Sequence, residues 1–174
     1  RIGRITPSAT LAMTAKAAEL RAAGKPVINL SVGEPDFPTP KNIRLAGQRA
    51  IEEGHTRYTP GGGTMELKKA VVEKLSRDNN LHYDTSQILI SCGGKHSLYN
   101  ACQALFQTGD EVIIFSPYWV SFPDFVSVTG AKPVFVNTNP LHQFEPVLDD
   151  LKAKITPRTK GIIINSPSNP TGGV

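Results

Sequence analysis

The second half of the chain alternates short apolar runs with segments of helical length. Strands are predicted at residues 88–91, 112–116, 134–136 and 161–165. Helices are predicted at residues 97–106, 122–128 and 146–155. Neighbouring parallel strands need a crossover connection between them, so this alternation is typical of a parallel sheet covered by helices. We therefore predict an α/β fold whose sheet is mostly parallel and whose connections are crossover helices.

The first half indicates an N-terminal arm of helices and loops that leads into this sheet. Helices are predicted at residues 8–23, 41–53 and 65–79, and a short strand at residues 27–32. Ser8 is a suitable N-cap for the first helix, and Gly24 is a suitable terminator. Residues 33–40 contain three prolines, which exclude a regular element there.

Composition narrows the classes of function. The 19 basic and 15 acidic residues are intermixed, so we expect no nucleic-acid binding. No apolar stretch approaches the roughly 18 residues of a membrane span, and we expect no membrane partner. Cys92 and Cys102 lack the spacing of a disulfide framework or a metal site, so we expect buried or reduced thiols, no metal and a cytoplasmic protein.

Ligands of open parallel sheets bind beyond the carboxyl ends of the strands. Three such ends carry unusual residues, at 92–95, 117–119 and 166–172, and together they could form one pocket. The Gly93-Gly94 turn before a helix could present backbone N–H groups and the helix dipole to a phosphate, or it could be an ordinary tight turn.

Two side chains at these strand ends have alternative interpretations. Trp119, the only tryptophan, could belong to the core or could stack on a planar ring. Asn169 could be an ordinary turn residue, or its position between Pro167 and Pro170 could aim its amide at a ligand.

Six segments, in matching order, resemble those of fold-type I aminotransferases that depend on pyridoxal phosphate. The similarity is to the bacterial branch of aspartate and aspartate/prephenate aminotransferases, and it extends over nearly the whole chain. The segments are residues 32–37, 58–61, 93–95, 109–112, 117–121 and 165–172.

This resemblance implies an enzyme that transfers an amino group between an amino acid, aspartate first, and a 2-oxo acid. It also implies a homodimer with a shared active site. Residues 1–40 would be the arm, a small-domain segment and the substrate loop, and residues 41–174 the first part of the cofactor-binding large domain. An aromatic or kynurenine-type aminotransferase, or a non-catalytic interaction module, is the alternative.

The resemblance also implies roles for particular residues. Gly94 and Lys95 would offer backbone N–H groups to the cofactor phosphate, and Trp119 would stack on the cofactor ring and border the substrate. Asn169 would hydrogen-bond the ring's phenolic oxygen and approach the substrate carboxylate. Cis peptide bonds are implied at Ser116–Pro117 and Asn169–Pro170.

Two further residues of the arm region are implied in binding. Gly33 would contact the same substrate carboxylate through its backbone, and Tyr58 would reach the phosphate bound in the partner subunit. The lysine that carries the cofactor as a Schiff base is expected beyond Val174, so no catalytic residue is expected here and the chain alone should be inactive. Lys95 does not match that lysine's motif, and both ends of the chain are expected to be fragment boundaries.

Overall fold

The computed structural model describes residues 3, 5, 7–31 and 33–174. Within these, residues 7–91 form one compact unit and residues 92–174 the main part of a second. No helix of the described residues is long and apolar enough to cross a membrane.

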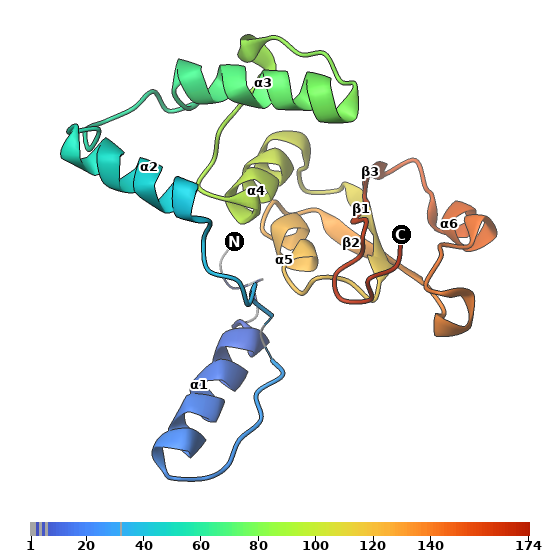
Figure 1. Cartoon of the computed structure of the whole chain (residues 1–174). Helices are drawn as coiled ribbons and strands as arrows, with labels where there is room; N and C mark the ends of the chain where they lie inside the picture. Colours follow the sequence, from blue (N-terminus) through green and yellow to red (C-terminus); the bar gives the residue numbers. More distant parts are fainter. Residues whose placement is uncertain (1–2, 4, 6, 32) are drawn as a thin grey trace. The chain divides into compact units, whose positions relative to one another are not determined.

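The unit of residues 7–91 consists of helices joined by loops. Its elements are α1 (Ala9–Ala22), α2 (Lys41–Glu52), α3 (Met65–Asn79) and a short 3-10 helix, η2 (Thr85–Gln87), as Figure 1 shows. The hydroxyl of Ser8 accepts a hydrogen bond from the Leu11 N–H at 3.3 Å, so Ser8 is the predicted N-cap. The helices lie within about two residues of their predicted bounds.

Two predicted strands of this unit are wrong. Residues 27–31 form no strand, and Ile28 and Leu30 are 89% and 91% exposed, whereas Val32 lies outside the described residues. Residues 88–91 form no strand either, although the Ile90 N–H donates to the Gly62 carbonyl at 3.0 Å. A strand needs a ladder of hydrogen bonds to a neighbour, and apolar composition alone does not supply one.

The unit of residues 92–174 has a three-stranded parallel sheet, as predicted, in the order β2-β1-β3. Its elements follow in Figure 1: α4 (Gly94–Leu105), β1 (Glu111–Ser116), α5 (Phe122–Ser127), β2 (Lys132–Asn137), the 3-10 helix η3 (Pro140–His142), α6 (Leu148–Lys154) and β3 (Thr159–Ile163). The sheet places the carboxyl ends of its strands along one edge.

Most bounds in this unit differ from the predicted ones by one to three residues, and two of these differences have a clear physical reason. Strand β3 ends two residues before the predicted 161–165 run does, because its pairing with β1 stops at Ile163 opposite Ile114. Helix α4 starts three residues earlier than predicted, because Gly93 adopts a φ of 87° and turns the chain directly into the helix.

The core of this unit surrounds the central strand. Val112, Ile113 and Ile114 of β1 are at most 1% exposed, and Val126 of α5 and Val136 of β2 are as deeply buried. A central parallel strand is covered on both faces, which explains the continuous apolar run of β1. Each such side chain contributes about 1.5–3 kcal/mol through burial.

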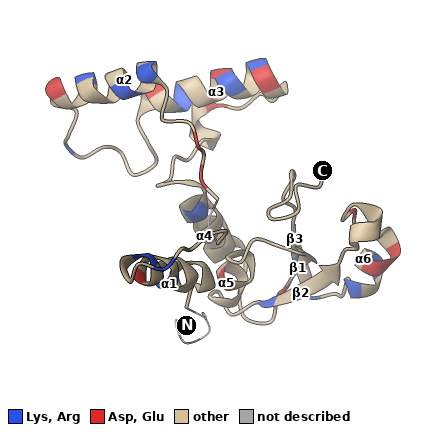
Figure 2. Ribbon diagram, turned by 60° about the horizontal axis from the view of Figure 1, so that its bottom comes forward, with Lys and Arg blue, Asp and Glu red and all other residues tan. Residues whose placement is uncertain are grey.

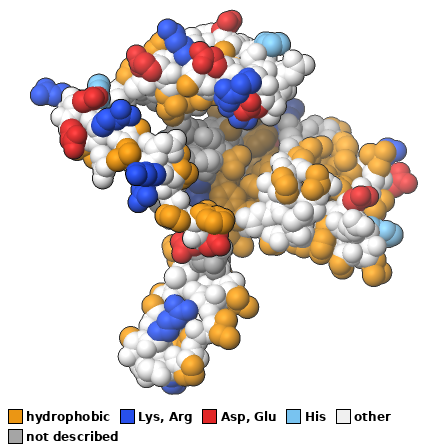
Figure 3. Space-filling model, viewed as in Figure 1, with side chains coloured by type: hydrophobic (Ala, Val, Ile, Leu, Met, Phe, Trp, Pro, Cys, Tyr) orange, Lys and Arg blue, Asp and Glu red, His pale blue; other side chains and the backbone are white. Residues whose placement is uncertain are grey.

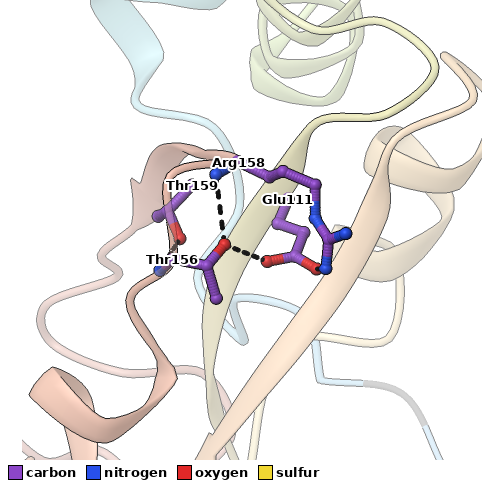
Figure 4. A network of polar contacts seen from close by, with 4 residues as sticks. All are labelled: Glu111, Thr156, Arg158 and Thr159. Carbon is purple, nitrogen blue, oxygen red and sulfur yellow. Dashed lines mark hydrogen bonds and ion pairs between the residues drawn. The ribbon is translucent and has the colours of Figure 1, made fainter.

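A polar network fastens the amino end of the sheet (Figure 4). The buried carboxylate of Glu111 accepts hydrogen bonds from Thr156 Oγ1 at 2.7 Å and from Arg158 Nη2 at 2.8 Å. The Thr156 hydrogen bond and then the Arg158 guanidinium lower the pKa of Glu111 below its ordinary value, against the opposing effect of burial. The network therefore joins the start of β1 to the loop that precedes β3.

Charged and apolar side chains are distributed differently over the surface. Basic and acidic residues both occur along α2, α3 and α6, as Figure 2 shows. Hydrophobic side chains, among them Leu148 and Ile164 at 60% and 76% exposure, also reach the surface (Figure 3).

Candidate functional site

A cavity of about 200 Å³ lies at the carboxyl edge of the sheet. The ends of β1 and β3 line it with the loops that follow them. Its walls include Ile114, Pro117, Tyr118, Thr138, Ser166 and Asn169. Two of the three strand-end loops predicted to form a pocket therefore meet, while the Gly93-Gly94 turn is not part of this wall.

The loop after β3 is closed on itself by hydrogen bonds. The Asn169 N–H donates to Asn165 Oδ1 at 2.8 Å, and the Gly172 N–H donates to the Ser168 carbonyl at 2.7 Å. These bonds place exposed Asn169 at the wall of the cavity. The peptide bonds Ser116–Pro117 and Asn169–Pro170 are cis as predicted, and Ser166–Pro167 is also cis, which was not predicted.

The turn that begins α4 leaves backbone donors open. Within the described residues, the N–H groups of Gly94 and Lys95 donate to no protein acceptor, as is usual for the first residues of a helix. A Cβ atom at Gly93 or Gly94 would meet nothing within 4 Å. Free N–H groups beside open space at the positive end of a helix dipole suit an anion.

Trp119 is held by aromatic and cationic neighbours. Its ring makes edge contacts with Phe122 and Phe125, at centroid distances of 5.4 and 5.8 Å. Lys95 Nζ lies 5.2 Å from the centre of the same ring. Trp119 is half-buried and packs against the core but does not line the cavity, so the core interpretation describes its present contacts.

Gly33 and Tyr58 belong to the other unit, residues 7–91. Tyr58 is fully exposed, and a Cβ atom at Gly33 would meet nothing within 4 Å. Both residues are therefore accessible, and their predicted contacts with substrate and cofactor stay predictions.

The family model for aminotransferase class I and II matches residues 25–174. The chain belongs to this family. The match includes both units, apart from the first helix and the residues before it.

Individual aminotransferases are similar over nearly the whole chain. An aspartate aminotransferase of Bacillus subtilis is 52% identical over 172 residues, which are 99% of this chain and 44% of the relative. An aspartate/prephenate aminotransferase of Nitrosomonas europaea is 50% identical over 174 residues, again 44% of the relative. The chain thus spans less than half the length of these curated relatives.

Solved aminotransferases share the fold. The aspartate aminotransferase of Thermus thermophilus solved with maleate matches at a TM-score of 0.93 and 44% identity, covering 97% of this chain and 44% of that one. The alanine aminotransferase of Pyrococcus furiosus matches at a TM-score of 0.90 and 34% identity. The incomplete fold-type I architecture is therefore confirmed.

The aminotransferase family uses pyridoxal phosphate, and the groups present here fit it. The cofactor combines an anionic phosphate with a planar aromatic ring. The unpaired N–H groups of Gly94 and Lys95 suit the phosphate, and the indole of Trp119 is a stacking surface of the right kind. The amide of Asn169 can donate to a ring oxygen.

Metal binding and cysteine chemistry were the other candidates for the described residues. No group of histidine, cysteine, aspartate or glutamate side chains there could hold a metal ion. Both cysteines are free, Cys92 exposed and Cys102 buried, and burial raises the pKa of the Cys102 thiol.

Two residues at the cavity wall had no individual role predicted from the sequence, although Tyr118 lies in the segment 117–119 that was expected to border a pocket. Tyr118 stacks on Phe135 of β2 with ring centroids 4.9 Å apart, and Thr138 donates from its hydroxyl to the Ser116 carbonyl at 2.8 Å. The position of Tyr118 at the end of a strand was a usable signal. Thr138 carried no such signal in the sequence, because its hydrogen bond to Ser116 depends on β2 lying beside β1.

Proposed function

We propose that this chain supplies the cofactor-binding part of an aminotransferase that exchanges an amino group between aspartate and a 2-oxo acid. The observation that carries the proposal is the open pair of N–H groups at Gly94 and Lys95 in a chain of this family. Relatives named aspartate aminotransferase or aspartate/prephenate aminotransferase, about half identical over 98% or more of the chain, support the choice of substrate.

Binding would be divided among three groups. The N–H groups of Gly94 and Lys95 hold the phosphate, and the α4 dipole adds to their attraction. The indole of Trp119 stacks on the cofactor ring and borders the substrate. The Asn169 amide donates to the ring's phenolic oxygen and approaches the substrate carboxylate, to which Gly33 also contributes its backbone.

The bond-breaking chemistry is supplied by pyridoxal phosphate, whose ring withdraws electrons from the amino acid. The residues of this chain bind and orient; none of its eleven lysines is proposed to bond covalently to the cofactor. Lys95 in particular is assigned to the phosphate turn through its backbone N–H group. Its ammonium lies 5.2 Å from the centre of the Trp119 ring.

Aspartate is favoured over other amino acids by two comparisons. The solved Thermus thermophilus relative carries maleate, a dicarboxylate like aspartate, and relatives named for aspartate are more similar than the 34% identical alanine aminotransferase. An aromatic or kynurenine-type specificity is the alternative.

We further propose that the protein is a cytoplasmic homodimer with a shared active site, in which Tyr58 reaches the phosphate of the partner subunit. Residues 1–40 would form the arm, small-domain segment and substrate loop, and residues 41–174 part of the large domain. The resemblance of residues 58–61 to a segment of fold-type I aminotransferases supports this assignment.

Titration of the purified chain with pyridoxal phosphate tests the binding role. Trp119 is the only tryptophan, so stacking should quench its fluorescence saturably, with one cofactor bound per chain. Equal quenching of the chain and of free tryptophan amide, without saturation, would favour the non-catalytic interaction module instead. Amino transfer from aspartate to a 2-oxo dicarboxylic acid, compared with transfer from phenylalanine and kynurenine, should be measured on the complete polypeptide that contains this chain.

A further inference from the structure

The last residues of β1 are paired on one side only in the described structure. The pairing of β1 with β3 stops at Ile114, opposite Ile163. Its pairing with β2 continues to Ser116, opposite Asn137. Pro117, which follows, has no backbone N–H with which to extend either ladder. The position of the chain where it leaves the sheet therefore depends on contacts from the end of β2.

Thr138, the residue directly after β2, supplies two hydrogen bonds at this point. Its backbone N–H donates to the Ser116 carbonyl at 2.9 Å, and its hydroxyl donates to the same oxygen at 2.8 Å. A carbonyl oxygen has two lone pairs, so the two bonds together use its accepting capacity. The hydroxyl bond is additional to the backbone bond, and it depends on the side chain at this position.

The two residues between Ser116 and Trp119 are fixed from both ends. Tyr118 stacks on Phe135 of β2, with ring centroids 4.9 Å apart. The Trp119 carbonyl accepts a hydrogen bond from the Phe122 N–H at 3.0 Å, which joins it to the start of α5. The backbone that carries the indole is therefore tethered to β2 on one side and to α5 on the other.

Such a tether affects how well a ligand can stack on Trp119. A binding surface that only a fraction of the molecules present binds its ligand with an affinity reduced by that fraction. A segment with several arrangements also loses conformational freedom when a ligand orders it. A tether that keeps one arrangement populated before binding therefore raises the affinity of a ligand that stacks on the indole.

We propose that Thr138 is a positioning residue, whose hydroxyl fixes the end of β1 and thereby places Trp119 for stacking on the cofactor ring. It acts through the Ser116 carbonyl and not by contact with the ligand. This inference rests on the proposed function of Trp119 as the stacking surface. A hydrogen bond between neutral groups corresponds to about a two- to tenfold change in an equilibrium constant, which sets the expected change in affinity.

The test compares two pairs of purified chains that differ in this hydroxyl: wild type with Thr138→Val, and Thr138→Ser with Thr138→Ala. Valine keeps the shape of threonine, and serine keeps its donor. Far-ultraviolet circular dichroism shows whether each variant is folded, and the second pair decides if valine prevents folding. The near-ultraviolet circular dichroism of Trp119 is recorded without ligand, and affinities for pyridoxal phosphate and for phosphate-free pyridoxal follow.

Thr129→Val is the matched control. The Thr129 hydroxyl donates to the Val126 carbonyl at 2.8 Å and accepts from the Ala131 N–H at 3.1 Å, in the turn between α5 and β2. The control therefore removes a hydroxyl-to-carbonyl bond of the same length, before β2 instead of after it. We expect it to lower the free energy of unfolding and to leave the tryptophan band and both affinities unchanged.

The expected result is a changed tryptophan band in both hydroxyl-free variants, with both ligands bound about two- to tenfold less tightly, and values close to wild type for Thr138→Ser. An unchanged band or unchanged affinities in these variants overturn the proposal, and so does a serine variant that shares the loss. An equal effect in Thr129→Val also overturns it, because the loss would then follow stability alone.

Failure of both hydroxyl-free variants to fold overturns the proposal too, because the hydroxyl would then serve the stability of the chain as a whole. A wild-type chain that binds neither ligand overturns the proposed function instead. The tryptophan band alone then decides whether the Thr138 hydroxyl holds the segment that carries Trp119.

Discussion

Arg158 donates from Nη2 to Glu111 Oε1 at 2.8 Å, across the gap between the loop before β3 and the first residue of β1. The Glu111 N–H in turn donates to the Arg158 carbonyl at 2.8 Å. Together, the side-chain contact and the backbone contact fix the amino end of the sheet. The cavity lies at the opposite, carboxyl end of β1.

The Glu111 network predicts a loss of stability in acid. The folded-state pKa of Glu111 is lowered, first by the Thr156 hydrogen bond, so its stabilising effect is complete above the unfolded value of about 4.3. This effect is lost as the pH falls through the lower folded value. The free energy of unfolding, measured with urea, should therefore fall more steeply below about pH 4.3 for wild type than for Glu111→Gln.

Glu145→Gln is the matched control for this comparison. Glu145 is exposed and makes no ion pair in the described residues, so its variant should follow the wild-type curve. Parallel curves for wild type and Glu111→Gln would mean that Glu111 has the same pKa in the folded and unfolded chain.

Gly161 should not tolerate a side chain. A Cβ atom there would lie 2.7 Å from Cζ of Phe106, in the middle of a strand that pairs with β1. We expect Gly161→Ala to lower the free energy of unfolding by about 1–3 kcal/mol through overpacking. Thermal or urea unfolding measures this loss.

Gly47 offers the matched control for that substitution. It lies inside α2 with open space around it, so Gly47→Ala should be neutral or stabilise by about 0.5–1 kcal/mol. Adding Phe106→Leu to Gly161→Ala should recover part of the loss. A double variant no better than the sum of its single changes would exclude the steric explanation.

The phosphate turn can be tested by deleting one N–H group. Gly94 is the first residue of α4, where proline is well accepted, so Gly94→Pro removes a donor and keeps the helix. Loss of a hydrogen bond to a charged group should weaken pyridoxal phosphate binding about tenfold or more. Gly94→Ala keeps the N–H and points its Cβ into open space, so it should bind nearly as wild type does. Equal affinities for the proline and alanine variants would contradict the assigned donor.

The sequence predicted the helices and the central strand better than it predicted the short apolar segments outside the sheet. The bounds of α3 and the cap at Ser8 follow from local propensity, and the apolar run of β1 follows from its burial on both faces. Residues 27–31 and 88–91 have the composition of strands, yet no neighbouring strand pairs with them in the described structure. Strand pairing is a property of the tertiary structure, so composition could not exclude the error.

The same distinction applies to the candidate site. The meeting of Pro117 with Asn169 was predictable, because the ends of parallel strands share an edge. The contact between Lys95 and Trp119 was not, since it depends on how α4 packs beside α5. Motifs identify residues that serve one ligand, whereas contacts between their side chains follow from packing.

The shared active site predicts a separable defect in mixed dimers. Tyr58→Phe should weaken phosphate binding in the partner's site, whereas Trp119→Ala should impair the site of its own subunit. In complete polypeptides, a hybrid of the two variants should place both defects in one site and leave the other intact, with roughly half of the wild-type activity per dimer. Activity of the hybrid that equals the mean of the two parents would rule out contribution of Tyr58 across the interface.

We expect this chain to bind pyridoxal phosphate through its turn and strand-end loops without supplying the lysine that bonds to it. Reduction of the chain with borohydride in the presence of the cofactor, followed by mass spectrometry of every lysine, measures this. The expected result is saturable binding with only scattered, substoichiometric labelling of exposed lysines and no turnover of aspartate. Stoichiometric labelling of one lysine, Lys95 above all, together with amino transfer by these 174 residues, would contradict it.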